Sequence, residues 1–180
     1  KDSSKINYLD FSNQSSLYDT LKYNHQSLPS AFTVYGGKVT IENSDFKNLK
    51  SEDALNLFRC KFKIENIKIE NTFSDAFDAD FCSGFMKNCS FTNCGNDGVD
   101  ISGGRLEISE SEFLNIKDKA ISAGEESKLK ASKCMIQNSS MGIISKDLSF
   151  VESIENKLLG CEIGYCACLL YTSPSPRDLM

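Results

Sequence analysis

The sequence repeats itself with a period of about 22 residues, a length typical of solenoid repeats. Each unit contains a short stretch in which apolar and polar residues alternate, which is typical of a strand with one face in water. The small residues that begin this stretch are Ala54, Ala76, Gly98, Ala120, Gly142 and Gly164. The large apolar residues that follow them are Leu55, Phe77, Val99, Ile121, Ile143 and Tyr165. Six units in register constrain the fold more than any other feature of the chain.

Two further segments of each unit keep the same period. One carries an apolar ladder of Ile69, Phe91, Phe113 and Met135, with Asn71, Asn93 and Asn115 two positions later. The other alternates at Val39/Ile41, Phe62/Ile64, Leu106/Ile108 and Leu129/Ala131. A unit with about three short strands can bury its inward side chains only by coiling and stacking on the next unit. The pattern therefore predicts an all-β fold, a right-handed single-stranded parallel β-helix of about six coils, with asparagine side chains that bond between the coils.

The chain divides into three segments. Leu17 and Leu21 stand at helical spacing after Ser15 and Ser16, within "SSLYDTLKYNHQ", and predict a short capping helix before the repeats. The stretch "CLLYTSPSPRD", from Cys168 to Asp178, resembles a translated sequencing adapter, and such segments are set aside in fold reasoning. We therefore expect a fragment with an N-terminal cap or preceding coil at 1–36, a β-helix at 37–167 and a non-native tail at 168–180.

Charge and cysteine content limit the partners. The net charge of -5 argues against a nucleic-acid surface, which needs clustered Lys and Arg. No run approaches the roughly 20 apolar residues of a membrane span. With Cys168 set aside, seven cysteines remain, and Cys60 and Cys82 lie one period apart, so a bridge between adjacent coils and buried thiols are both open. We expect buried thiols.

The period also gathers acidic residues on one side of the middle coils. Asp53, Asp75, Asp97 and then Lys119 occupy one equivalent position, and Asp78 and Asp100 occupy another three residues later. Two carboxylates about 5 Å apart repel by roughly 1 kcal/mol in water, so a solvated sheet face tolerates such a column.

Several coils resemble bacterial right-handed β-helix proteins of the pectin-lyase-like superfamily. The resemblance covers about Thr33 to Ala167 and rests on "SEDALNL", "SDAFDADF", "GNDGVDIS", "DKAISAGE" and "MGIISKDLS". It implies a carbohydrate-facing protein outside the cytoplasm, that is extracellular, at the cell surface or periplasmic. A polysaccharide or cell-surface glycan is the partner that this resemblance implies. A fold by itself does not give an activity.

Three hypotheses compete for the acidic columns. In the first, Ca²⁺ is held by Asp75, Asp78, Asp97 and Asp100, and Lys119 or Lys146 acts as the base of a polysaccharide lyase. In the second, Asp78 and Asp100 hydrolyse a glycosidic bond. In the third, the polar residues only cap turns, as in a structural or adhesin-type module. The catalytic candidates are accordingly Lys119, Asp100 and Asp78.

Exposed aromatic rings would favour sugar binding. The chain has no Trp, and Phe58, Phe81 and Tyr165 are the aromatic residues expected outside the core. The lack of Trp weakens the case for an aromatic sugar platform, so the carbohydrate-related role expected on the acidic face of the middle coils is what the resemblance implies.

Overall fold

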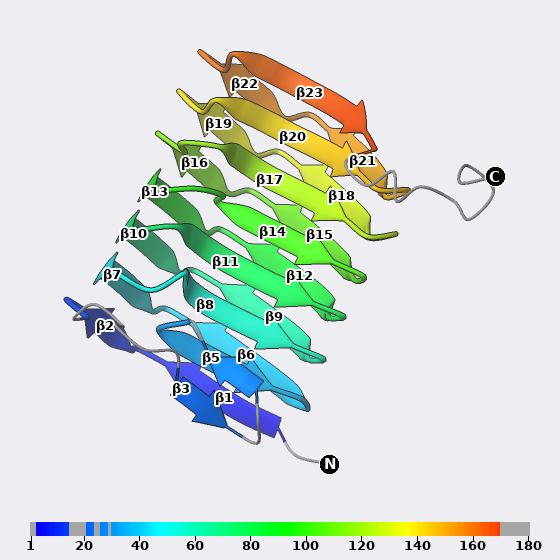
Figure 1. The fold of residues 1–180 in the computed structure, drawn as a ribbon. Coiled ribbons are helices and arrows are strands. Elements are labelled where there is room, and N and C mark those ends of the chain that lie inside the picture. Colours follow the sequence, from blue (N-terminus) through cyan, green and yellow to red (C-terminus); the bar gives the residue numbers. More distant parts are fainter. Residues whose placement is uncertain (1–2, 15–20, 24–25, 29, 170–180) are drawn as a thin grey trace, which may run out of the picture.

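Three parallel sheets of seven strands each form the three sides of a coiled chain (Figure 1). The structure is a computed structural model that describes residues 3–14, 21–23, 26–28 and 30–169. We call the sheets I, II and III in the order in which the chain enters them, and one strand of each makes a coil. The predicted β-helix is confirmed: β6 to β23 make six coils, and the described residues contain no helix.

The strand bounds follow the chain from coil to coil. Sheet I contains β1 (Ser3–Asn7), β6 (Lys38–Glu42), β9 (Lys61–Glu65), β12 (Ser83–Lys87), β15 (Arg105–Ser109), β18 (Lys128–Ser132) and β21 (Phe150–Ile154). Sheet II contains β2 (Asp10–Ser12), β7 (Asp45–Leu49), β10 (Lys68–Thr72), β13 (Ser90–Cys94), β16 (Glu112–Leu114), β19 (Met135–Gln137) and β22 (Lys157–Leu159). Sheet III contains β5 (Phe32–Tyr35), β8 (Asp53–Phe58), β11 (Asp75–Asp80), β14 (Val99–Ser102), β17 (Lys119–Gly124), β20 (Met141–Lys146) and β23 (Ile163–Cys168).

The segment before the repeats also contributes strands to the three sheets. Strands β1, β2 and β5 pair with β6, β7 and β8, respectively. An antiparallel pair, β3 (Leu21–Tyr23) and β4 (Gln26–Leu28), lies between β2 and β5 in the chain. The predicted capping helix is wrong where the structure describes this stretch, because Leu21–Tyr23 is a strand; residues 15–20 and 24–25 lie outside the described part.

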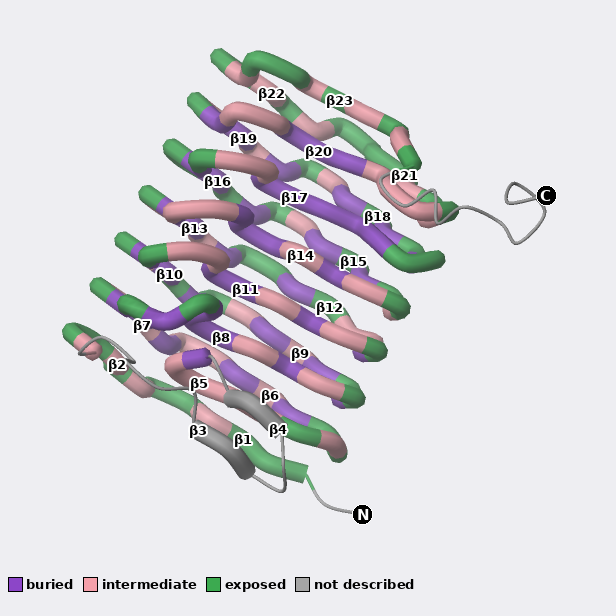
Figure 2. The backbone as a smooth tube through the Cα atoms, in the orientation of Figure 1, coloured by how far each residue is buried: buried purple, intermediate pink, exposed green. Residues whose placement is uncertain are grey.

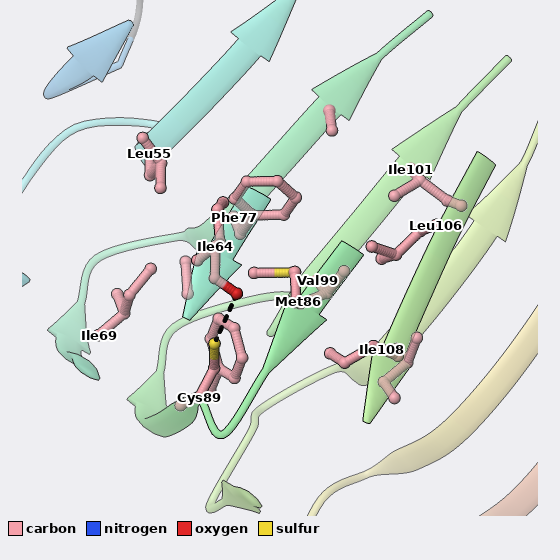
Figure 3. Close-up of a cluster of buried hydrophobic side chains, with 14 of the residues drawn as sticks. Leu55, Ile64, Ile69, Phe77, Met86, Cys89, Val99, Ile101, Leu106 and Ile108 are labelled. Atoms are coloured by element: carbon pink, nitrogen blue, oxygen red, sulfur yellow. Dashed lines mark hydrogen bonds between the residues drawn. The ribbon is translucent and has the colours of Figure 1, made fainter. Parts of the chain in front are cut away.

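The inward side chains form columns that fill the coil. Leu55, Phe77 and Val99 of sheet III are fully buried, as the period predicts, and face Ile64 and Met86 of sheet I (Figure 3). Burial is continuous through the middle coils and falls off in the first and last ones (Figure 2). The core is therefore shared between coils, and each coil depends on its neighbours.

One predicted ladder shifts by a residue. Ile136, not Met135, pairs with Phe113 and is fully buried, while Met135 lies opposite Glu112. The cause is the turn after β17, which spans 125–127, whereas the turn after β14 spans only 103–104. The extra residue makes this coil longer than the one before it, since Arg105 pairs with Lys128 here but with Ser83 in the preceding coil.

Asparagine amides bond to one another between the coils. The longer ladder joins Asn13, Asn48, Asn71, Asn93, Asn115 and Asn138 through side-chain bonds of 2.8–3.5 Å. A second ladder, not predicted from the sequence, joins Asn7, Asn43, Asn66 and Asn88. Every one of these residues except Asn7 has a positive φ, a conformation that Asn adopts more readily than most residues. The ladders therefore fix the chain direction at the turns.

Small polar side chains accept hydrogen bonds from backbone N–H groups at the turns. The Cys60 backbone N–H donates to Cys82 Sγ at 3.1 Å, and the Cys89 N–H donates to Ser111 Oγ at the same distance. Gly104 uses Ser127 of the next coil in the same way. All eight cysteines are free, so Cys60 and Cys82 are separate thiols and not a bridge. The Cys82 sulfur accepts from the turn backbone, whereas the Cys60 thiol donates to carbonyl oxygens such as that of Phe58 at 3.3 Å.

We predict that Phe91→Ala lowers the free energy of unfolding by about 3–5 kcal/mol, the usual cost of emptying a buried phenylalanine site. The Phe91 ring is fully buried and stacks on Phe113, with centroids 4.8 Å apart. Urea unfolding followed by circular dichroism measures the change. Phe73→Ala is the control, because Phe73 is 74% exposed. Equal losses in both variants would contradict the packing argument.

Candidate functional site

The predicted acidic residues lie along sheet III in two columns. We call the first the capping column; it contains Asp53, Asp75, Asp97 and Lys119. We call the second the outer column; it contains Asn56, Asp78, Asp100 and Ser122, which are direct partners in the parallel register. The structure therefore brings Asp78 beside Asp100 and Asp75 beside Asp97, as the period requires.

Carboxylates of the capping column bind the backbone of the following coil. Asp75 Oδ1 accepts hydrogen bonds from the Asp97 backbone N–H at 2.8 Å and from Asn96 Nδ2 at 2.7 Å. Asp97 Oδ1 accepts from the Lys119 backbone N–H at 3.0 Å. The small residue that follows is confined, since a Cβ on Gly98 would lie 2.7 Å from the Ala120 carbonyl oxygen. This geometry matches the turn-capping hypothesis for these residues.

Burial and stacking raise the pKa values of the carboxyl groups in this column. Burial, and next the charge of Asp75, raise the pKa of Asp53 to about 7. Burial raises the pKa of Asp97 to about 6, although hydrogen bonds and charge from Lys119 act against it. Asp53 is therefore only partly ionised at neutral pH, whereas Asp97 is mostly ionised there.

Lys119 is held by two carboxylates. Its Nζ lies 3.0 Å from Asp97 Oδ1 and also bonds Asp118 Oδ2. Burial lowers the pKa of Lys119, but hydrogen bonds and charge from Asp118 and Asp97 outweigh it and raise the pKa above its ordinary value. A general base must be deprotonated to act, so this environment favours a structural cation. The catalytic role of Lys119 stays a prediction.

The outer column contains a carboxyl group that retains its proton near neutrality. Asp78 Oδ2 accepts a hydrogen bond of 2.6 Å from Asn56 Nδ2, and burial, followed by the charge of Asp53, raises the Asp78 pKa to about 8. Burial also raises the pKa of Asp80, two residues along β11. Asp78 is therefore mostly a neutral acid at pH 7.

Asp100 differs because a lysine from two coils away neutralises it. Lys146 Nζ lies 3.2 Å from Asp100 Oδ2 and reaches across the intervening coil. Gly124 makes room for this, since a Cβ there would lie 3.0 Å from Lys146 Cε. The other oxygen, Asp100 Oδ1, and the fully buried Ser122 Oγ have no hydrogen-bond partner among the described residues.

An aromatic cluster stands at the edge where sheet III turns into sheet I. It contains Tyr35, Phe58 and Phe81, with Arg59 over the Phe58 ring at 5.1 Å. The Tyr35 and Phe58 rings stack with centroids 5.2 Å apart, and Phe81 meets Phe58 edge-on. Tyr35 and Phe81 are about half exposed.

Phe58 and Phe81 are predicted by the sequence, but Tyr35 is not. Tyr35 pairs directly with Phe58 in the sheet, although the interval between them is one residue longer than the period. Tyr165 is exposed as expected, but it lies in the last coil, where its hydroxyl bonds Ser153 Oγ at 2.8 Å. Tyr165 is therefore no part of the aromatic cluster.

The acidic side chains do not converge as a calcium site would require. The described residues contain no group of three or more His, Cys, Asp or Glu arranged to hold a metal. Ca²⁺ takes about six to eight oxygen ligands, whereas Asp97 and Asp100 each contact a lysine ammonium. This arrangement does not fit Ca²⁺, and we assign no chemistry to a metal. The proposed ligands Asp75, Asp78, Asp97 and Asp100 stay a prediction.

Comparison with known families agrees with this architecture. A family model described as a right handed beta helix region matches residues 53–175, more than half of the chain. The chain belongs to the right-handed β-helix family. No curated protein and no solved structure matches this β-helix protein. Its described residues form no helix that could span a bilayer.

We predict that the stability of this β-helix protein falls as the pH rises from 5 to 8. Asp78 holds its proton more tightly in the folded state than in the unfolded chain. Its contribution is therefore present below the unfolded pKa of about 4 and is lost as the pH rises through about 8. Between pH 5 and 8 the loss is at most about 4 kcal/mol, because each pKa unit corresponds to about 1.4 kcal/mol.

Asp78→Asn should flatten this pH profile and raise the melting temperature at pH 8, since an amide cannot ionise. Thermal unfolding at a series of pH values measures both effects. Asp10→Asn, on an exposed position of β2, is the control. The same flattening in both variants would show that Asp78 is not the source.

Proposed function

We propose that this β-helix protein is a polysaccharide-binding module that holds a glycan along the outer face of sheet III. The observation that carries the proposal is the aromatic cluster beside the outer column. Tyr35 and Phe81 offer exposed ring surface, and Asp80 follows the outer column on β11. Apolar faces of sugar rings pack on aromatic rings, and sugar hydroxyls donate hydrogen bonds to carboxyl oxygens.

The spacing of the coils supports the same ligand class. Neighbouring strands lie about 4.8 Å apart, so equivalent groups repeat along the sheet at about the length of one sugar unit. Gly103 leaves room for the Phe81 ring, since a Cβ there would lie 2.8 Å from the ring. The proposal includes membership of the bacterial pectin-lyase-like superfamily, which several coils resemble, and a location outside the cytoplasm.

We expect Phe81→Ala to weaken glycan binding by about tenfold, which corresponds to about 1.4 kcal/mol. Binding to a panel of immobilised polysaccharides identifies the ligand, and titration calorimetry measures the change. Phe73→Ala removes an exposed ring away from the aromatic cluster and should bind as the wild type does. Absence of retention on every polysaccharide of the panel would leave a structural module.

Glycoside hydrolysis is the second candidate. Asp78 and Asp100 are neighbours in register, and their environments differ, because Asp78 keeps its proton while Asp100 pairs with Lys146. Two carboxyl groups with distinct environments are what an acid and a nucleophile require. This candidate assigns proton donation to Asp78 and attack on the anomeric carbon to Asp100.

Hydrolysis is tested by the release of reducing ends from the polysaccharide that binds. Asp78→Asn and Asp100→Asn should each lower the rate at least about a hundredfold while the glycan still binds. Wild-type protein that binds the glycan but releases no reducing ends would reduce the site to binding alone.

A further inference from the structure

A second charged surface lies on sheet I, around the corner from the aromatic cluster. Four cations share the first outward position of their strands and stand in one line along the coils. They are Lys38, Lys61, Arg105 and Lys128, interrupted only by Ser83. We call this line the cationic column. All four cations are exposed.

The cationic column is left without internal counter-ions. Other lysines of sheet I pair with glutamates: Lys63 binds Glu42 and Glu65 at 2.9 and 2.8 Å, and Lys130 binds Glu152 at 3.6 Å. By contrast, no ion pair or side-chain hydrogen bond involves the four cations among the described residues. Each neighbouring pair in register instead repels by roughly 1 kcal/mol in water, which an external anion would relieve.

The end of the column opens into a groove. Phe150 follows Lys128 in the register and is 65% exposed. A hollow of about 290 Å³ is lined here by Arg105, Glu107, Lys128, Lys130, Phe150 and Glu152, together with Leu106 and Leu129. A ring that packs on Phe150 would place a substituent beside Arg105 and Lys128. The groove therefore brings cations and an exposed aromatic ring together around a space of about the size of one sugar ring.

We propose that the cationic column binds a linear anionic polysaccharide that runs parallel to the coil axis. Cations repeat at the strand spacing of about 4.8 Å, with one gap at Ser83, which suits a chain with one negative group per sugar unit. Phe150 packs against one sugar ring at the groove. The site is separate from the glycan face of sheet III and does not depend on it.

Nucleic acid fits this surface less well. Duplex DNA carries one negative charge per about 1.7 Å of its axis, on two strands, and is bound by broad clusters of Lys and Arg. Here the cations form a single file, with paired charges beside them and a net charge of -5 on the whole chain. A sparse linear polyanion matches one file of charges.

The test uses the whole chain with a linear polyuronate, a linear sulfated glucan of similar length and a neutral glucan. Titration calorimetry should show binding of a polyanion but not of the neutral glucan. Comparing the two polyanions distinguishes carboxylate from sulfate. Lys61→Gln/Arg105→Gln should lower the affinity at least about tenfold and reduce its decrease between about 50 and 200 mM salt. Phe150→Ala should lower the affinity without changing that salt dependence.

The matched control is Lys68→Gln/Lys157→Gln, which removes the same charge from sheet II, at exposed positions of β10 and β22. It should bind as the wild type does, and all variants should keep the wild-type circular dichroism spectrum. Equal losses in the two double variants, or tighter binding of a DNA duplex than of either polyanion, would overturn the proposal. Phe81→Ala should leave polyanion binding unchanged, which separates this test from that of the sheet III site.

Discussion

Parallel backbone pairing between successive coils is the constraint on which the rest of this molecule depends. It continues through the turns, where the Lys61, Ser83 and Arg105 N–H groups donate to Gly37, Cys60 and Cys82 carbonyls at 2.8–2.9 Å. Because every coil must match the one below it, each side chain stands over an equivalent side chain. Chemistry therefore appears in columns: apolar residues inside, asparagine amides at the turns, and charges outside.

Stacking identical side chains in a column stabilises the fold for some residue types and destabilises it for others. Asparagine both donates and accepts, so an unlimited ladder of amides satisfies itself. Ionised carboxylates repel when they are stacked, and the chain relieves this in two ways. Asp78 and Asp53 keep protons near neutral pH, and Asp97 and Asp100 meet lysines. We therefore expect the stacking of these carboxyl groups to make the stability of the protein depend on pH.

The outer faces differ in how completely their charges are paired. On sheet III both lysines, Lys119 and Lys146, are paired with carboxylates, and the exposed rings of the aromatic cluster stand beside these columns. On sheet I the glutamates neutralise one line of lysines, and no described residue pairs with the cations of the neighbouring line. The ligands that we propose for these two faces therefore differ in chemistry, because the sheets point in different directions.

The sequence by itself determined which residues face inward and which acids stand together. Strand side chains alternate with period two, and a coil of constant length carries that alternation to the next coil, so Phe77, Asp78 and Asp100 could be placed from spacing alone. Only the tertiary structure decided the register after the longer turn at 125–127, which put Ile136 in the core in place of Met135. It also decided the ion pairs, since the reach of Lys146 over Gly124 depends on space that no interval encodes. The cationic column of Lys38, Lys61, Arg105 and Lys128 could not be predicted from a constant period, because the interval between coils changes where the turns lengthen.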